Sequence, residues 1–129
     1  MSLIRVLMIA LLFIGCKKEQ VNPTADNEII VQYQQSASKK IIGKDWKVTF
    51  LSIKENSLCP PNSECIWQGR LVVDLEINQE EIELGLGDLT SNTETELVNE
   101  VVISGVTITF SEAHDYTETA KTKVVLSFD

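Results

Sequence analysis

Apolar and polar residues alternate with a period of two in five segments between Asp45 and the end of the chain. Such alternation predicts β-strands that turn one face toward a core and the other toward water. The positions that mark these strands are Trp46, Val48 and Phe50; Leu71, Val73, Leu75 and Ile77; Ile82, Leu84 and Leu86; residues 97–103 and 106–110; and Val124, Leu126 and Phe128. No segment has a sustained helical period, so the pattern indicates an all-β domain.

Turn-forming residues separate the predicted strands. Asn78-Gln79 and Ser104-Gly105 stand where tight hairpin turns are expected, and longer loops are predicted over residues 85–95 and 111–120. The prolines, at positions 23, 60 and 61, lie outside every predicted strand, as ladder hydrogen bonding requires. These features favour an antiparallel sandwich or a small barrel. We interpret residues 28–129 as a small antiparallel β-sandwich of six to eight strands, with the last strand closing the sheet.

The residues before Asp45 are more polar. Residues 16–27 have the composition of a flexible tether, and residues 28–34 are predicted to form a first strand at the edge of a sheet. Residues 1–15 contain Arg5, a run of nine apolar residues from Val6 to Ile14, and Gly15. Nine helical residues span about 14 Å, half of a hydrocarbon core, so this run predicts a signal peptide and not a membrane-spanning helix.

Phe13-Ile14-Gly15-Cys16 resembles the lipobox of bacterial lipoproteins, with Phe13 where leucine is commoner. The resemblance implies cleavage before Cys16 and acylation of that cysteine, so the expected first partner is a membrane, contacted through the acyl chains. Lys17 and Lys18 follow, where an aspartate would signal inner-membrane retention in enteric bacteria, so outer-membrane delivery is expected. The alternative is an ordinary cysteine near an ordinary secretory cleavage site. The membrane face stays open.

The charge of the chain is acidic and unevenly distributed. Asp and Glu total 19 against 11 Lys and Arg, and residues 71–129 alone carry 13 acids and 2 bases. Binding to nucleic acid is not expected, because phosphate contacts need a basic surface. The acidic half has two interpretations: a solubilising face, or a site for cations or for a basic partner.

Cys59 and Cys65 remain as a pair once Cys16 is assigned to the anchor, and export makes a disulfide between them chemically permitted. Pro60 and Pro61 stiffen the loop that the bridge would close. Trp67 is expected to begin the next strand, and Gly69 to permit a bulge or a close backbone approach. The alternatives for the two cysteines are a metal site or a redox pair, but the chain has one histidine and lacks the Cys-x-x-Cys spacing.

The segment Ser57-x-Cys59-Pro60, followed by Cys65-Ile66-Trp67-x-Gly69, resembles a motif of small bacterial secreted and lipid-anchored β-sandwich domains that are largely uncharacterised. Asn56 and Gln68 differ from the expected Asp and Ala. A late Asp115-Tyr116 extends the resemblance loosely toward the end of the chain. The resemblance implies a structural role for Pro60, Trp67 and Gly69 and no activity.

Two further groups of residues were considered as sites. His114, the only histidine, lies beside Glu112 and Asp115 and is interpreted as a solvated loop residue, with a metal ligand or general base as the alternative. The carboxylates of a possible calcium loop are Asp88, Glu94 and Glu96, which lack EF-hand spacing. No nucleophile elbow or phosphate-binding loop is present in the sequence. No catalytic residue, metal ligand or cofactor is therefore assigned.

The sequence thus predicts a lipid-anchored protein of the cell envelope that acts as a non-enzymatic binding or structural module with an unknown protein partner. One alternative is an inhibitor or adhesin-like domain that presents loops 87–95 and 111–120 to a protein target. The other is an enzyme that uses His114 with nearby carboxylates.

Overall fold

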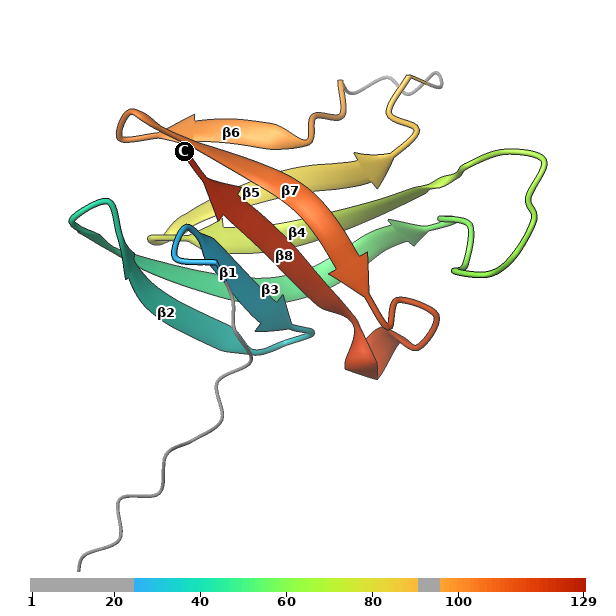
Figure 1. Cartoon of the computed structure of the whole chain (residues 1–129), viewed down its shortest axis with the longest axis horizontal. Coiled ribbons are helices and arrows are strands. Elements are labelled where there is room, and N and C mark those ends of the chain that lie inside the picture. The colour runs from blue at the N-terminus through green and yellow to red at the C-terminus, as the bar shows by residue number, and fades with distance from the viewer. Residues whose placement is uncertain (1–24, 91–95) are drawn as a thin grey trace, which may run out of the picture.

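A computed structural model describes residues 25–90 and 96–129 of the chain, and this part is almost entirely β-structure (Figure 1). Its eight strands are β1 (Glu28–Gln32), β2 (Ser36–Ile41), β3 (Lys44–Asn56), β4 (Arg70–Ile77), β5 (Glu80–Gly87), β6 (Glu100–Ile103), β7 (Val106–His114) and β8 (Lys123–Phe128). A single 3₁₀ turn, η1 (Thr119–Lys121), precedes β8.

The strands form two antiparallel four-stranded sheets, with orders β1-β8-β7-β6 and β2-β3-β4-β5. The chain passes from the first sheet to the second after β1 and returns after β5. The predicted all-β sandwich is therefore confirmed. Asn78-Gln79 and Ser104-Gly105 form the two expected hairpin turns, with φ angles of 49°, 71°, 51° and 78°. Positive φ at both residues matches the twist of the strands that such a turn joins.

The inward faces of the two sheets meet in one core. Trp46 on β3 packs against Phe128 on β8, with ring centroids 5.0 Å apart, so the contact joins the two sheets. Every second residue of β3 from Trp46 to Phe50 is buried, as the period-two pattern predicts. The largest fully buried side chains are Trp46, Phe50, Phe110, Phe128, Leu71, Leu75, Ile77, Leu84, Ile108, Leu126, Val31 and Val48.

Strand β2 was not predicted, because its residues look polar in sequence. Ala37, Lys39 and Ile41 take the inward positions, and only Ile41 is a large apolar residue. Lys39 takes an inward position because β2 lies at a sheet edge, where the amine can leave the core. Its Nζ donates hydrogen bonds to the carbonyl oxygens of Ala25 and Glu28, at 2.8 and 3.1 Å.

Strand β7 continues through residues 111–114, which were predicted to be a loop. A register shift between Phe110 and Glu112 interrupts its pairing with β8. A β-bulge of this kind changes which side chains face the core, so the period-two pattern is lost although the strand continues. His114 is consequently the last residue of a strand, and the connection to β8 begins at Asp115.

Four smaller expectations were also wrong. Strand β6 begins at Glu100 and not at 97, because the carbonyl of Val98 accepts a hydrogen bond from the amide of Gly85 on β5. Strand β5 extends through Gly87. Strand β8 pairs with both β1 and β7, so it lies inside its sheet and does not close it. Trp67 precedes β4, which begins at Arg70. The expected edge position of β1 is confirmed.

The two ends of the sandwich carry different segments (Figure 1). The start of β1 pairs with the end of β8, so the chain enters the domain at the end that also carries the β2–β3, β4–β5 and β6–β7 turns. The β3–β4 connection and the β7–β8 turn lie at the opposite end. Residues 57–69, called the stapled loop below, therefore project away from the N-terminal side of the domain.

The predicted signal peptide, the lipobox, Cys16, Pro23 and most of the predicted tether lie outside the described residues, as does Glu94. In the part of the chain that is described, no helix has the length and apolar character needed to cross a membrane.

Candidate functional site

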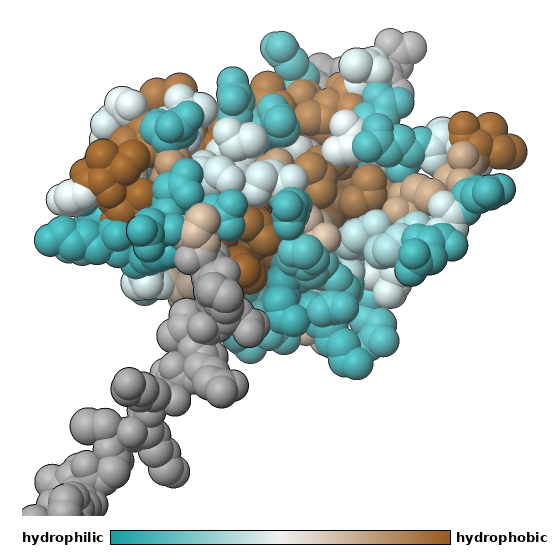
Figure 2. Space-filling model, in the orientation of Figure 1, coloured by the Kyte–Doolittle hydropathy of each residue, from teal (hydrophilic) through white to brown (hydrophobic). Residues whose placement is uncertain are grey.

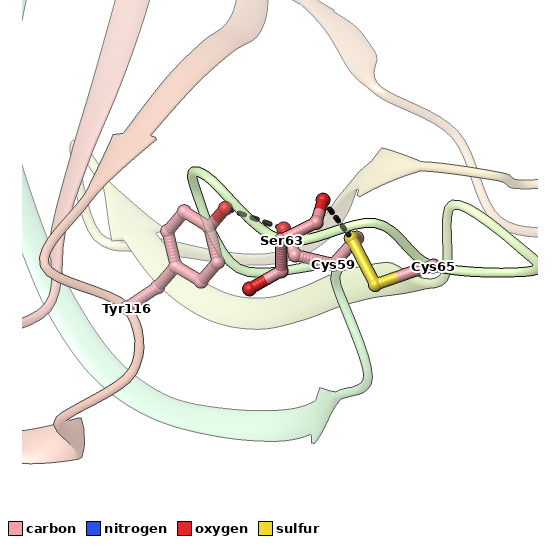
Figure 3. The surroundings of a disulfide bond; sticks show 4 residues. All are labelled: Cys59, Ser63, Cys65 and Tyr116. Carbon is pink, nitrogen blue, oxygen red and sulfur yellow. Dashed lines mark hydrogen bonds between the residues drawn. A yellow bond between two sulfur atoms is a disulfide. The ribbon is translucent and has the colours of Figure 1, made fainter.

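The stapled loop is closed by a disulfide between Cys59 and Cys65, whose Cα atoms are 6.0 Å apart. The expected disulfide is therefore present. Within the ring, the amide of Ser63 donates to the carbonyl of Pro60 at 3.3 Å. Cys59 Sγ lies 3.5 Å from the carbonyl oxygen of Ser63 (Figure 3), and because an oxidised sulfur carries no proton, this is a sulfur–oxygen contact. The ring is thus a compact turn with few internal degrees of freedom.

Backbone hydrogen bonds hold the base of the stapled loop together. The amide of Ser57 donates to the carbonyl of Arg70 at 2.8 Å, and the amide of Cys59 donates to the carbonyl of Gln68 at 2.8 Å. The amide of Arg70 donates to Ser57 Oγ at 3.2 Å. Arg70 Nε also lies 2.7 Å from Glu55 Oε2 on β3. The two arms of the loop therefore continue the β3–β4 pairing beyond the ends of both strands.

At Gly69 the backbones of the two arms approach closely. Its φ is +69°, and a Cβ at this position would overlap the carbonyl oxygen of Ser57. Its carbonyl also accepts a hydrogen bond of 2.8 Å from the amide of Asp88. The close backbone approach expected at Gly69 is present, and only glycine fits it.

Tyr116 connects the stapled loop to the other sheet. Its hydroxyl donates to the carbonyl oxygen of Cys59 at 2.7 Å, and Figure 3 shows the ring pointing from the β7–β8 turn toward the loop. The side-chain amide of Asn56 donates to the carbonyl oxygen of Tyr116 at 2.6 Å. Sequence reasoning gave neither residue a role. Two signals pointed to Tyr116: it is an aromatic residue within a polar turn, and Asp115-Tyr116 belongs to the motif resemblance.

The stapled loop exposes two large apolar side chains, Ile66 at 97% and Trp67 at 65%, and Trp67 lies near the base of the loop, in a hollow that Ser57 and Arg70 also line. Figure 2 shows apolar surface at the outer end of this loop, at the right of the view. Trp67 therefore does not serve as core, and Pro60 is exposed as well. Hydrophobic residues scattered over a surface are ordinary, but two adjacent ones on a fixed loop form an apolar contact point.

A hollow of about 430 Å³ lies beside the base of the loop. The residues that line this hollow are Leu58, Cys59, Gln68, Leu86, Gly87, Glu112, Ala113, His114 and Tyr116. His114 Nε2 lies 3.2 Å from Glu112 Oε2, and both side chains are more than half exposed. The structure thus brings His114 beside the stapled loop, as one member of an exposed pair.

Of the three carboxylates considered for calcium, Asp88 and Glu96 are in the part of the chain that is described and Glu94 is not. Asp88 Oδ1 accepts hydrogen bonds from the amide and the hydroxyl of Thr90, at 3.0 and 2.7 Å. Within residues 25–90 and 96–129, no group of three or more His, Cys, Asp or Glu side chains has an arrangement that could hold a metal ion.

The bonds from Thr90 lower the pKa of Asp88, the side-chain bond most and the backbone bond next, with a further contribution from Arg70. We expect the Thr90→Val variant to raise this pKa toward the ordinary value, incompletely because the amide of residue 90 still donates. Because the pKa of Asp88 is lower in the folded state than in the unfolded state, this carboxylate stabilises the fold at pH values above the unfolded pKa. That stabilisation is lost as the pH falls through the folded pKa. Titration of the Asp88 carboxyl carbon by NMR measures the change, and an unaltered pKa would contradict it.

Removing the disulfide should lower stability without unfolding the sandwich. We expect the Cys59→Ser/Cys65→Ser variant to lose about 2 kcal/mol of unfolding free energy, the chain-entropy value for a seven-residue ring, less the part already removed by the prolines. Urea denaturation followed by circular dichroism measures this loss. The native spectrum should persist, because the Ser57–Arg70 and Tyr116–Cys59 hydrogen bonds do not depend on sulfur. A globally unfolded variant would show that the disulfide is required for the fold itself.

Comparison with known proteins finds no matching family model, no matching curated protein and no matching solved structure.

Proposed function

We propose that this chain is a lipid-anchored binding module of the bacterial cell envelope. Acyl chains on Cys16 hold the protein in a membrane, and the stapled loop contacts a protein partner through Ile66 and Trp67. The lipobox-like residues 13–16 support the anchor, and Lys17 and Lys18 favour the outer membrane. In this proposal the module is non-enzymatic and holds a partner at the membrane.

One observation carries the binding role: the exposed side chains of Ile66 and Trp67 sit on a loop whose shape is already constrained. The disulfide, the Gly69 approach and the Tyr116 hydrogen bond all restrict the backbone beneath them. Binding through such a loop loses little conformational entropy, and tryptophan is among the residues that contribute most to interfaces. Neither side chain contributes to the core, so a role in stabilising the fold does not account for these two residues.

The location of the stapled loop supports the same function. It lies at the end of the sandwich opposite the point where the chain enters β1. A domain tethered at its N-terminus would therefore present Ile66 and Trp67 away from the anchor. The hollow lined by Tyr116 and His114 adjoins the loop and offers room for a partner side chain.

Site-specific photo-crosslinking in intact cells tests the binding role. A photo-reactive residue at position 67 should give a defined crosslinked product, which mass spectrometry then identifies. The matched control is position 102 on the edge strand β6, because Val102 is as exposed, at 64%, as Trp67, at 65%. Equal crosslinking from both positions, or none from position 67, would contradict a binding role for the stapled loop.

The anchor is tested separately. The mass of the N-terminal peptide of the mature protein should correspond to an acylated Cys16 with residues 1–15 removed. The Cys16→Ala variant should keep its leader, because the lipoprotein signal peptidase requires a modified cysteine. A mature protein with an unmodified thiol at Cys16 would overturn the proposed anchor. The binding role would still be decided by the crosslinking experiment.

A further inference from the structure

The basic residues of the described part of the chain fall into two groups. Lys54, Arg70, Lys121 and Lys123 each form an ion pair with a carboxylate. The other four form none within the described residues, and all of them lie on the hairpin of β2 and β3: Lys39, Lys40, Lys44 and Lys47. Residues 36–47, called the basic hairpin below, contain one acid, Asp45. Their net charge is +3 in a chain whose total is −8.

The basic hairpin lies at the end of the sandwich where the chain enters the domain. Lys39 Nζ contacts the backbone oxygens of Ala25 and Glu28, so the hairpin touches the segment that leads into β1. The turn of the hairpin exposes Ile42 at 66%, with Gly43 beside it. Figure 2 shows apolar surface bordered by hydrophilic surface at this end of the molecule, at the left of the view.

We propose that the basic hairpin docks on the anionic lipid surface of the membrane that holds Cys16. The inference rests on the anchor proposed above. Ala25 is nine positions after Cys16, and a chain of this length spans at most about 30 Å when fully extended. An anchor so close keeps the hairpin at a high effective concentration over the head groups. Lys40 and Lys47, both exposed, then meet lipid phosphates, and Ile42 enters the apolar boundary beneath them, whereas Lys44 Nζ lies 4.9 Å from the centroid of the Trp46 ring.

The remaining charges of the domain favour contact through the β2 edge of its sheet over contact through the β5 edge. Residues 71–129 have a net charge of −11, and strand β5, at the far edge of the sheet from β2, carries Glu80, Glu81 and Glu83. The β4–β5 turn with Glu80 shares the hairpin's end, so anionic lipids repel the β5 edge and attract the β2 edge, and the domain tilts onto the basic hairpin. Docking through the hairpin leaves the stapled loop, at the opposite end, facing away from the bilayer. The lipid surface would thus orient the binding site as well as hold the protein.

The test uses the mature acylated protein in vesicles of phosphatidylcholine, with and without phosphatidylglycerol. With Cys16 acylated and Cys59 and Cys65 oxidised, the Ile42→Cys variant has one thiol for a fluorescent label. The Asn62→Cys variant places the same label in the stapled loop. Quenchers carried on lipid head groups should quench the label at 42 on anionic vesicles and leave the label at 62 unquenched. The effect at 42 should disappear in 1 M salt, where the Debye length is about 3 Å.

Matched charge variants identify the residues responsible. Neutralising Lys40→Gln and Lys47→Gln together should reduce the docked population about fivefold for each lysine. The control variant, Lys121→Gln with Lys123→Gln, changes the net charge equally at the other end of the sandwich and should dock normally. Circular dichroism verifies that both variants are folded.

Two outcomes would overturn the docking proposal. One is equal quenching of labels at 42 and 62 on anionic vesicles, and the other is equal docking by the two double variants. The mass of the N-terminal peptide, measured on the same preparation, separates the causes. An unacylated Cys16 would overturn the anchor and the docking together, whereas an acylated Cys16 with an unquenched label at 42 would overturn the docking alone.

Discussion

Replacing Gly69 with alanine is expected to lower the free energy of unfolding by about 3 kcal/mol. An alanine at a φ of +69° costs about 1 kcal/mol through backbone strain alone. Its Cβ would also overlap the carbonyl oxygen of Ser57, so the two arms of the stapled loop must separate. The separation breaks the hydrogen bonds between Ser57 and Arg70, which contribute about 1 kcal/mol each. Urea denaturation measures the loss.

Gly43 provides the matched control for this variant. It has a φ of +71° in the turn of the basic hairpin, and a Cβ there would meet no atom within 4 Å. The Gly43→Ala variant should therefore lose only the strain contribution, about 1 kcal/mol. Equal losses from the two variants would show that the contact between Gly69 and Ser57 does not hold the loop.

The Trp46→Ala variant is expected to lose about 3–5 kcal/mol, most of the stability of a small domain. Trp46 is 1% exposed and packs against Phe128 of the other sheet, so its removal leaves a cavity where the sheets meet. Its Nε1 donates a hydrogen bond of 3.3 Å to the carbonyl of Ile41, which the variant leaves without that donor. Circular dichroism is the suitable probe, because the substitution removes one of the two tryptophans.

The second tryptophan is the control, because it is the same residue type in the opposite environment. The Trp67→Ala variant should change the free energy of unfolding by less than about 0.5 kcal/mol, since the side chain is mostly exposed. The same variant should abolish the contacts proposed for the stapled loop. A large loss of stability from Trp67→Ala would return this residue to a structural role and remove the main support for the binding proposal.

The strand pattern was predictable where one face of a strand is uniformly apolar. Strands β3, β4 and β8 bury alternate large side chains, with Val72 and Val125 buried in addition, and this alternation is visible in the sequence. The alternation did not predict β2, because Lys39 takes an inward position and its amine donates to the carbonyl oxygen of Glu28 at the sheet edge. It also did not predict the end of β7, because a bulge shifts the register after Phe110. In both cases the deciding interaction is made with a residue outside the strand itself.

The candidate site likewise has features that the sequence predicts and features that it does not. The disulfide and the glycine constraint could be predicted, because a close pair of cysteines and a glycine beside a rigid loop have local causes. The roles of Tyr116 and Asn56 could not, because their hydrogen bond and the Tyr116 contact with Cys59 bridge separations of 60 and 57 residues. The exposure of Trp67 was also missed, since a tryptophan before a strand is equally consistent with core packing.

The sequence by itself determined the all-β class, the two hairpin turns and the stapled ring, because each depends on side-chain alternation or on residues a few positions apart. Only the tertiary structure decided which end of the sandwich each segment occupies. Strand pairing sets the stapled loop at one end and the basic hairpin, with the start of β1, at the other. Pairing joins residues up to about a hundred positions apart, and the pattern along a chain carries no record of which strands will become neighbours.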